Sequence, residues 1–313
     1  MLTETRQIEE FLNDYKRSRI IIESSVRATL NRALEFEHKF NKPFYEFSTE
    51  EVLEMYKSAH AISNRSLQNS NLTLKHAARW MLYNKGMDTN NVYENITKDL
   101  IENCIDTEKR DSLILSREDL NNIQNELANM TDIAILELLF LGVGGKFLKE
   151  LTFLDMSQVS KNDSMIYFKT GKKIHIDNDM YNLIRKACLE DELISFNDTV
   201  RISKVKSLGI YKQRFNSLSA NADDNSVDDI ERRYRWVQRR LYLISKHIGI
   251  DLKPGTIQDS GLLHCLKQGV KETGLEFREY VKTEECGNIA KRFDLYTNLY
   301  GQIIIEKFEK YFK

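Results

Sequence analysis

The chain has 313 residues, of which 41% are hydrophobic and 30% charged, and only two are prolines. This length allows two domains of ordinary size, and the composition is typical of a helix-rich globular protein. No apolar run approaches the roughly 20 residues of a membrane-spanning helix, and the N-terminus lacks the charged-then-apolar plan of a signal peptide. The four cysteines form no CxxC pair, which argues against a zinc site and against disulfides. We therefore expect a cytoplasmic protein without metal, cofactor or membrane association.

The net charge is −1, but basic and acidic side chains are unevenly distributed along the chain. Residues 105–160 carry 5 basic and 10 acidic side chains, whereas residues 161–254 carry 18 and 13, a net charge of +5. An excess of positive charge in one block is expected of a surface that binds phosphate, although such asymmetry also arises by chance.

Residues 1–103 are predicted to form helices separated by short turns. Ser48 followed by Glu51 is typical of a capping box. Between Leu74 and Leu82, apolar residues recur at i, i+3, i+4, i+7 and i+8, which predicts a helix with one buried face, and Gly86 should end it. The basic residues of this helix project away from the apolar face: Lys75, His76 and Arg79. They are candidate DNA contacts, and a solvated helix face is an equally good explanation.

The polar, charged stretch at residues 107–111 is the predicted linker. After it, Ser116 with Asp119 three residues later predicts another capped helix. The domain boundary is therefore expected near residue 110, with a first domain at residues 1–108 and a second at residues 109–313.

Residues 136–159 predict an apolar helix, a glycine turn and a second helix that contains Glu150. Residues 165–176 then predict two short strands around a basic turn. The turn supplies three more candidate DNA contacts: Lys169, Lys172 and Lys173. A basic hairpin tip can bind phosphate passively, without any catalytic role.

The strongest periodic signal lies at residues 226–250. Apolar residues follow a 3-4-3-4 spacing from Val227 to Ile248, which predicts a helix with a buried seam, and Asp228 and Asp229 suit its N-terminus. Away from that seam lie the basic residues Arg232, Arg233, Arg235, Arg239, Arg240 and Lys246. Because arginine suits phosphates and guanine edges, this helix is the leading candidate for DNA contact. A solvated face or a surface for an acidic protein partner is the alternative.

Three C-terminal segments complete the pattern. LKPGTIQDSGLLHCLKQG at residues 252–269 predicts a turn that leads into a helix. Glu285-Cys286-Gly287 and Tyr296-Thr297-Asn298 follow. The tail at residues 302–312 is amphipathic, so it could pack on its own domain or dock into a neighbouring subunit.

In this order and spacing, the segments resemble the boxes of the tyrosine recombinases, or phage integrases. Glu150-Leu151 aligns with the end of the family's Thr-Gly-Leu-Arg-x-x-Glu-Leu box, and residues 169–172 resemble its Lys-Thr-Gly-Lys hairpin. Residues 252–269 resemble the second box, in which a Pro-His turn leads into Leu-Arg-His. The resemblance covers about residues 5–312. It implies a mainly α fold with a small β-sheet and two domains: a helical, SAM-like core-binding domain that forms half of a clamp around duplex DNA, and an integrase catalytic-type domain.

At the catalytic positions the chain departs from the family pattern. Those positions are occupied by Phe147, Lys169, Gly255, Gln258, Asp259, Gly287 and Tyr296. A neutral phenol with a pKa of about 10 cannot attack phosphate without arginine donors and a proton acceptor, and the loss of one donor alone typically costs about 10²- to 10³-fold in rate. We therefore expect no catalytic residue, although residues 145–150, residues 255–260 and Tyr296 should still meet around one cleft.

The resemblance therefore implies a sequence-specific DNA-binding regulator, most similar to the integrase-like lysogeny repressors of SPβ-type phages. Its expected partner is double-stranded operator DNA, on which it could form a dimer or a larger assembly, and a protein or peptide effector is possible. Two alternatives stay open. One is an active recombinase that uses Tyr296 and Lys169, and the other is a protein that binds an integrase and no DNA.

Overall fold

The structure is a computed structural model that describes residues 5–18, 23–62, 64–87, 90–195, 201–214, 227–295 and 298–312. The chain divides into two compact units, Met1–Ser112 and Leu113–Lys313, which we call the N-terminal and C-terminal units. In the described ranges, none of the helices combines the length and the apolar composition that crossing a bilayer requires.

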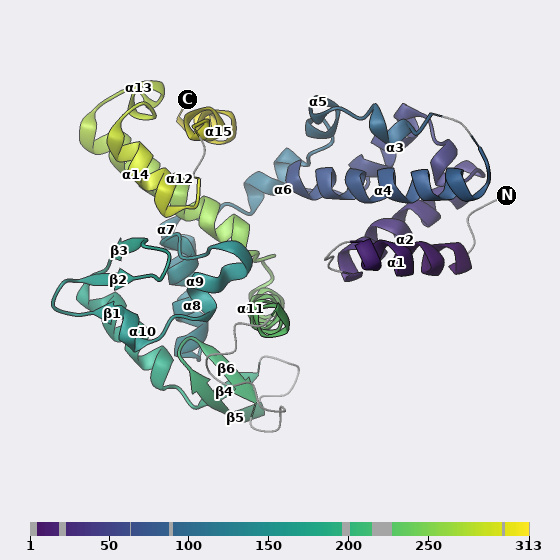
Figure 1. Cartoon of the computed structure of the whole chain (residues 1–313). Coiled ribbons are helices and arrows are strands. Elements are labelled where there is room, and N and C mark those ends of the chain that lie inside the picture. The colour runs from purple at the N-terminus through teal and green to yellow at the C-terminus, as the bar shows by residue number, and fades with distance from the viewer. Residues whose placement is uncertain are drawn as a thin grey trace. The chain divides into compact units, whose positions relative to one another are not determined.

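The N-terminal unit is helical (Figure 1). Its helices are α1 (Thr5–Ser18), α2 (Glu23–Phe40), α3 (Thr49–Lys57), α4 (Asn64–Asn84), α5 (Lys98–Glu102) and α6 (Thr107–Ser112), with short 3-10 turns η1 (Phe44–Glu46) and η2 (Val92–Glu94). The predicted capping box of Ser48 and Glu51 starts α3. The predicted apolar face of α4 is confirmed, because all five of its residues between Leu74 and Leu82 are buried. Gly86 follows the helix with a φ of 63°, a left-handed conformation that glycine adopts without strain.

The stretch at residues 107–111, the predicted linker, is helical in the structure. It forms most of α6, and the backbone N–H of Lys109 donates to Asp106 Oδ1 at 2.9 Å, which satisfies one amide of the first turn. A short polar segment can thus be helical when an aspartate caps it.

The C-terminal unit contains nine described α-helices and two small sheets. The helices are α7 (Arg117–Asn125), α8 (Met130–Phe140), α9 (Lys149–Thr152), α10 (Asn178–Leu189), α11 (Val227–Ile248), α12 (Pro254–Thr273), α13 (Phe277–Tyr280), α14 (Glu284–Arg292) and α15 (Tyr300–Phe308), with 3-10 turns η3 (Lys146–Leu148), η4 (Met156–Gln158) and η5 (Glu309–Phe312). Ser116 and Asp119 form the predicted capping box of α7.

Helix α8 is the centre of this unit. It packs against α7, α10, α11 and α12, and almost all of its residues are buried, as expected of a helix that is apolar on every side. Its contact with α12 is close at Gly261, where an added Cβ would lie 1.8 Å from the carbonyl oxygen of Phe140. A side chain at this position would therefore force α8 and α12 apart. Helices α12 to α15 enclose a second apolar cluster, to which Ile304 and Phe308 of α15 belong. The described part of the tail thus packs on its own unit.

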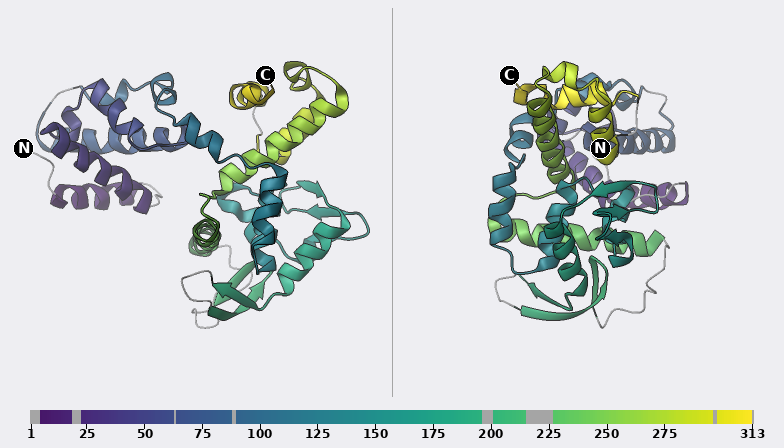
Figure 2. Two further views of the ribbon diagram at one scale, coloured as in Figure 1. Left: turned by 180° about the vertical axis from the view of Figure 1, so that it is seen from behind. Right: turned by 90° about the vertical axis from the view of Figure 1, so that its left-hand side faces the viewer.

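The described residues form two antiparallel three-stranded sheets, whereas the sequence predicted one small sheet. The first contains β1 (Val159–Ser160), β2 (Met165–Tyr167) and β3 (Lys173–His175), and β2 and β3 form the predicted hairpin. The second contains β4 (Glu192–Ser195), β5 (Arg201–Leu208) and β6 (Tyr211–Arg214). The second sheet lies beside α11 in all three views, and β6 contacts that helix (Figures 1 and 2).

Candidate nucleic-acid interface

Helix α11 is amphipathic in the way that its sequence predicts. Val237, Leu241 and Ile244 belong to the core of the unit and are at most 1% exposed. Arg235, Arg239 and Lys246 are exposed and point away from this core. Their spacing of i, i+4 and i+11 places them on one face of the helix. Tyr242 also lies on this face, is 57% exposed, and has its ring 5.6 Å from Lys246 Nζ. We call these four residues the α11 basic face. Sequence reasoning missed Tyr242, although its i+7 spacing from Arg235 could have identified it.

Two of the six predicted arginine and lysine contacts on α11 are buried, and the prediction of a DNA contact is wrong for them. Arg233 is 1% exposed, and its Nε donates to Asp229 Oδ2 at 2.7 Å. Its guanidinium lies between the rings of Phe153 and Tyr211, at 4.1 and 4.6 Å from their centroids. Arginine in this environment stabilises the fold through ion pairing and ring contacts, and cannot reach a duplex on the surface.

Arg240 is the second buried arginine, at 6% exposure. It forms a two-pronged ion pair with the fully buried Asp132 of α8, in which its Nε donates to Asp132 Oδ1 at 2.8 Å. Asn129 Nδ2 donates to the same carboxylate at 2.7 Å. Arg240 therefore holds α11 against α8.

Of the other predicted arginines, Arg232 is half-buried and pairs with Asp229 at 3.0 Å. Arg235 also has an acidic partner, Glu231, at 2.5 Å, but its side chain is 65% exposed. Exposed pairs of this kind contribute little to stability, so a phosphate can replace the carboxylate at small cost.

The second sheet adds basic residues that sequence reasoning missed. Lys204 and Lys206 of β5 are exposed, and side chains two residues apart in a strand share one face. Their face also contains Tyr211, because Leu208 pairs with Tyr211 in the register. The Tyr211 ring packs edge-on against Trp236 of α11 at 5.3 Å. The two lysines therefore lie on the face of the sheet that is turned toward α11. Their spacing of two residues in the sequence could have identified them as candidate contacts.

Parts of two segments aligned with the recombinase boxes lie close together in the C-terminal unit. Gln258 at the start of α12 donates to the carbonyl of Val143 at 3.4 Å, and Asp294 accepts from the backbone N–H of Gly145 at 2.8 Å. Gln258 therefore bonds a residue two positions before the 145–150 segment, and Gly145 of that segment bonds Asp294. Tyr296 lies outside the described residues. We call the region of these two contacts the box cleft.

Lys172 occupies the box cleft. Its Nζ lies 2.9 Å from Glu150 Oε2 and 3.1 Å from Asp294 Oδ1, and it donates to the carbonyl of Gly142 at 2.8 Å. With 6% of its side chain exposed, Lys172 is not available to DNA on the surface, and that prediction is wrong. Lys169, which the sequence placed in the catalytic position, is exposed on the hairpin turn, as is Lys173 on β3. The lysine that reaches the cleft is therefore Lys172.

The remaining recombinase-like positions have structural environments of their own. Phe147 has a left-handed backbone, with φ of 58°, and its ring lies 6.0 Å from that of Tyr234 on α11. The next residue, Leu148, is also left-handed, so this turn holds strain of about 1–2 kcal/mol for each residue. Asp259 pairs with Lys307 of α15 at 2.5 Å.

The two glycines among these positions differ in their surroundings. An added Cβ would meet nothing within 4 Å at Gly255, whereas at Gly287 it would lie 3.1 Å from the Tyr300 hydroxyl. Gly287 therefore leaves room for a packed tyrosine, while the space beside Gly255 is open.

The candidate contacts of the N-terminal unit have partners within that unit. Lys75 and Arg79 both pair with Glu94, and the ring of His76 lies 5.6 Å from that of Tyr15. Arg79 remains exposed, whereas Lys75 and His76 are half-buried. Arg79 is thus the residue of the three with the most accessible charge.

Comparisons with known proteins give two findings. Residues 114–310 match the model of a family described as MrpR, C-terminal catalytic domain. The chain is also 25% identical over 247 residues to the SPbeta prophage-derived uncharacterized protein YopR of Bacillus subtilis (strain 168). That alignment covers 75% of this chain and 74% of the relative. The family match includes α11 and both segments of the box cleft.

Proposed function

We propose that this chain, which belongs to the family of the MrpR C-terminal catalytic domain, is a sequence-specific DNA-binding transcriptional regulator that does not cleave DNA. The observation that carries the proposal is the α11 basic face. Arg235, Arg239 and Lys246 are exposed along one side of a helix whose opposite side is anchored in the core. Arginine and lysine on a rigid helix suit the phosphates and base edges of a duplex, and Tyr242 can add apolar contact.

A tyrosine-recombinase architecture without its chemistry is part of this proposal. The hydrogen bonds of Gln258 with Val143 and of Asp294 with Gly145 support the architecture. Phe147 and Gln258 stand where the resemblance expects arginines, and the cleft contains the carboxylates of Glu150 and Asp294. Carboxylates repel a phosphate, and stabilisation of a pentavalent phosphorus requires cationic donors that converge on it. The cleft is therefore suited to holding the hairpin and α12 in place, and not to strand exchange.

A prophage context is also proposed, because the relative YopR is prophage-derived. The partner would be double-stranded operator DNA in a bacterial cytoplasm, bound by a dimer or larger assembly. The lysines of the second sheet would extend the contact beyond α11.

The purified protein should recover short palindromic or repeated sites from fragmented bacterial and phage DNA. Those sites should lie near promoters, and their affinity should fall steeply with salt because phosphate contacts release counterions. Attachment-like inverted arms would instead favour recombination. Failure to retard any DNA at low salt, together with a stable complex with an integrase, would favour a protein-interaction role.

No covalent protein–DNA adduct is expected on a nicked suicide substrate that carries the recovered site. Tyr296→Phe should bind the same site with unchanged affinity, because a nucleophile without arginine donors contributes nothing to ground-state binding. The test is a denaturing gel of the end-labelled substrate. An adduct formed by the wild type and lost in Tyr296→Phe would establish an active recombinase.

Replacement of both Lys204 and Lys206 by glutamine should weaken DNA binding about tenfold and reduce the dependence of log affinity on log salt by up to about two. Glutamine keeps the side chain polar but removes its charge. Lys271→Gln, on an exposed position of α12, is the matched control and should leave both quantities unchanged. If the double variant bound DNA as tightly as the wild type, the second sheet would not be part of the interface. The proposed role of α11 would not be affected by that result.

A further inference from the structure

The C-terminal unit contains a cavity of about 960 Å³ that the proposed DNA contacts do not use. It is bounded by α7, α8, α10, α12 and α14 and by the turn that joins β3 to α10. Cavities of about 300–1,000 Å³ are of the size that binds small molecules in proteins. The cavity is therefore large enough for an organic ligand.

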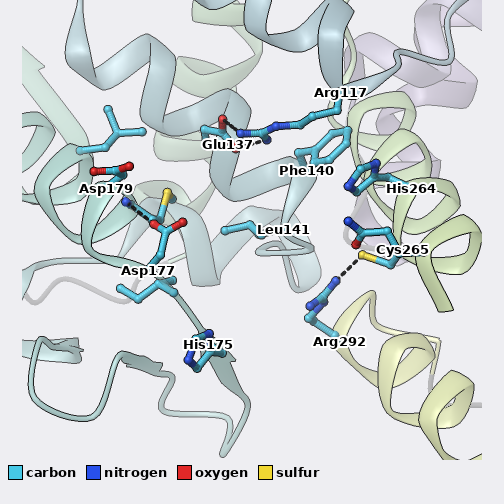
Figure 3. A pocket seen from close by; sticks show the side chains of 14 residues that line it. Arg117, Glu137, Phe140, Leu141, His175, Asp177, Asp179, His264, Cys265 and Arg292 are labelled. Carbon is cyan, nitrogen blue, oxygen red and sulfur yellow. Dashed lines mark hydrogen bonds and ion pairs between the residues drawn. The ribbon is translucent and has the colours of Figure 1, made fainter. Parts of the chain in front are cut away.

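The walls of this cavity differ in charge (Figure 3). Arg117, His264 and Arg292 lie on one side, and Asp177 and Asp179 at the start of α10 lie on another. The rest of the lining includes the apolar residues Phe140, Leu141, Ile176, Met180 and Leu183 and the polar side chains of His175 and Gln268. A ligand that fits must combine an apolar body with a charged end that faces the basic side.

The charge of Arg117 is already neutralised. Its two terminal nitrogens donate to the two carboxylate oxygens of Glu137, each at 2.7 Å. Burial lowers the pKa of His264, and the nearby charges of Arg117, Arg292 and Lys267 lower it further, so this imidazole is neutral at neutral pH. Of these three basic residues, Arg292 is therefore the one whose positive charge could attract an anionic ligand.

Arg292 lacks an anionic partner among the residues that the structure describes. Its Nη2 donates to the Sγ of Cys265 at 2.5 Å, and its buried Nε has no hydrogen-bond partner in the described ranges. Burial raises the pKa of the Cys265 thiol, so the sulfur is protonated and cannot balance the guanidinium charge. A sheltered cation with only a thiol as acceptor is costly unless an anion joins it.

From this arrangement we infer that the cavity is a binding site for a small organic anion, with one carboxylate or phosphate-ester group held by Arg292 and an apolar body against Leu141, Met180 and Leu183. His264 lies beside the anion position and can donate one hydrogen bond to it. Asp177 and Asp179 disfavour a second negative charge at the far end. The site therefore selects ligands with one anionic end. This inference is independent of the proposed DNA-binding function.

The experiment is a titration of the full chain with anilinonaphthalenesulfonate, a fluorescent organic anion, and with phenylnaphthylamine, which has the same rings and no charge. The sulfonate should bind saturably at one site, and Arg292→Gln should weaken it about tenfold, the value of one charged contact. Arg292→Lys should retain most of the affinity, and Lys271→Gln should retain all of it. The neutral dye should bind every variant alike.

A competition experiment then tests the need for an apolar body. Octanoate should displace the sulfonate dye, whereas inorganic phosphate at the same concentration should not. Equal weakening of both dyes by Arg292→Gln, or equal binding of the sulfonate by wild type and Arg292→Gln, would overturn the inference. Displacement by inorganic phosphate would also overturn it, because it would show an ion site without an apolar requirement.

Discussion

Replacing both Arg235 and Arg239 by alanine is expected to weaken binding to the recovered DNA site about 100-fold at moderate salt. Each arginine is exposed on the α11 basic face and can make one charged contact, which is worth about tenfold in affinity. The slope of log affinity against log salt should also flatten by about two, because two fewer phosphates are neutralised. Titration by fluorescence anisotropy at several salt concentrations measures both quantities.

A matched control is available on α13. Arg278 is 68% exposed and pairs with Glu309 at 2.5 Å, much as the 65% exposed Arg235 pairs with Glu231 at 2.5 Å. Arg278→Ala should leave DNA affinity and its salt dependence unchanged. The thermal stability of all three proteins should agree closely, because exposed substitutions rarely change it. If the double variant bound DNA as tightly as Arg278→Ala, the α11 basic face would not be the interface.

The contrast between exposed and buried arginines on α11 shows what periodicity can predict. The spacing of the apolar residues predicted the helix and its buried side, because a repeat of 3.6 residues determines which residues share a face. The spacing could not show that Arg240 is buried and Arg239 exposed, since the partner of Arg240 is Asp132, 108 positions away in the sequence. For Arg233 a local signal existed, because Asp229 lies four residues earlier on the same helix.

The hairpin at residues 165–176 illustrates a second limit. Alternation and turn residues predicted its strands, which the register confirms. The turn geometry then decided which lysine enters the box cleft. Gly171 has a φ of 85°, and Lys172 immediately after it reaches Asp294, 122 positions later in the chain. Motif alignment assigned the cleft to Lys169 because sequence spacing alone does not specify the direction of a side chain at a tight turn.

The second sheet was missed although β5 has eight residues, because the position of its strand β4 depends on a contact far away in the sequence. Strand β4 has only four residues, and its position depends on Asn129, whose side-chain amide bonds both the N–H and the C=O of Ile194 at 2.8 and 3.0 Å. A buried amide that pairs with a strand in this way is a tertiary contact. Local propensity therefore carried little information about the sheet.

Replacing Arg240 by alanine is expected to lower the free energy of unfolding by about 3–5 kcal/mol, because it leaves the fully buried Asp132 without its cation. Arg239→Ala, the adjacent exposed position, should change the same quantity by less than about 0.5 kcal/mol. Urea unfolding of the full chain measures the difference. It is best followed by fluorescence in a Trp80→Phe background, where Trp236 beside Tyr211 is the remaining tryptophan.

A double variant separates the cost of an unpaired charge from the value of the pair itself. Arg240→Met combined with Asp132→Leu removes both charges, and should recover most of the stability lost in Arg240→Ala. Asn129 Nδ2 would lose one acceptor, Asp132, but would keep the carbonyl of Ile194 at 3.0 Å. If the double variant were as unstable as the single one, the contacts of the Arg240 stem, and not charge burial, would hold α11 to α8. Because the α11 basic face is on the opposite side of that helix from its seam, DNA binding by the folded double variant should equal that of the wild type.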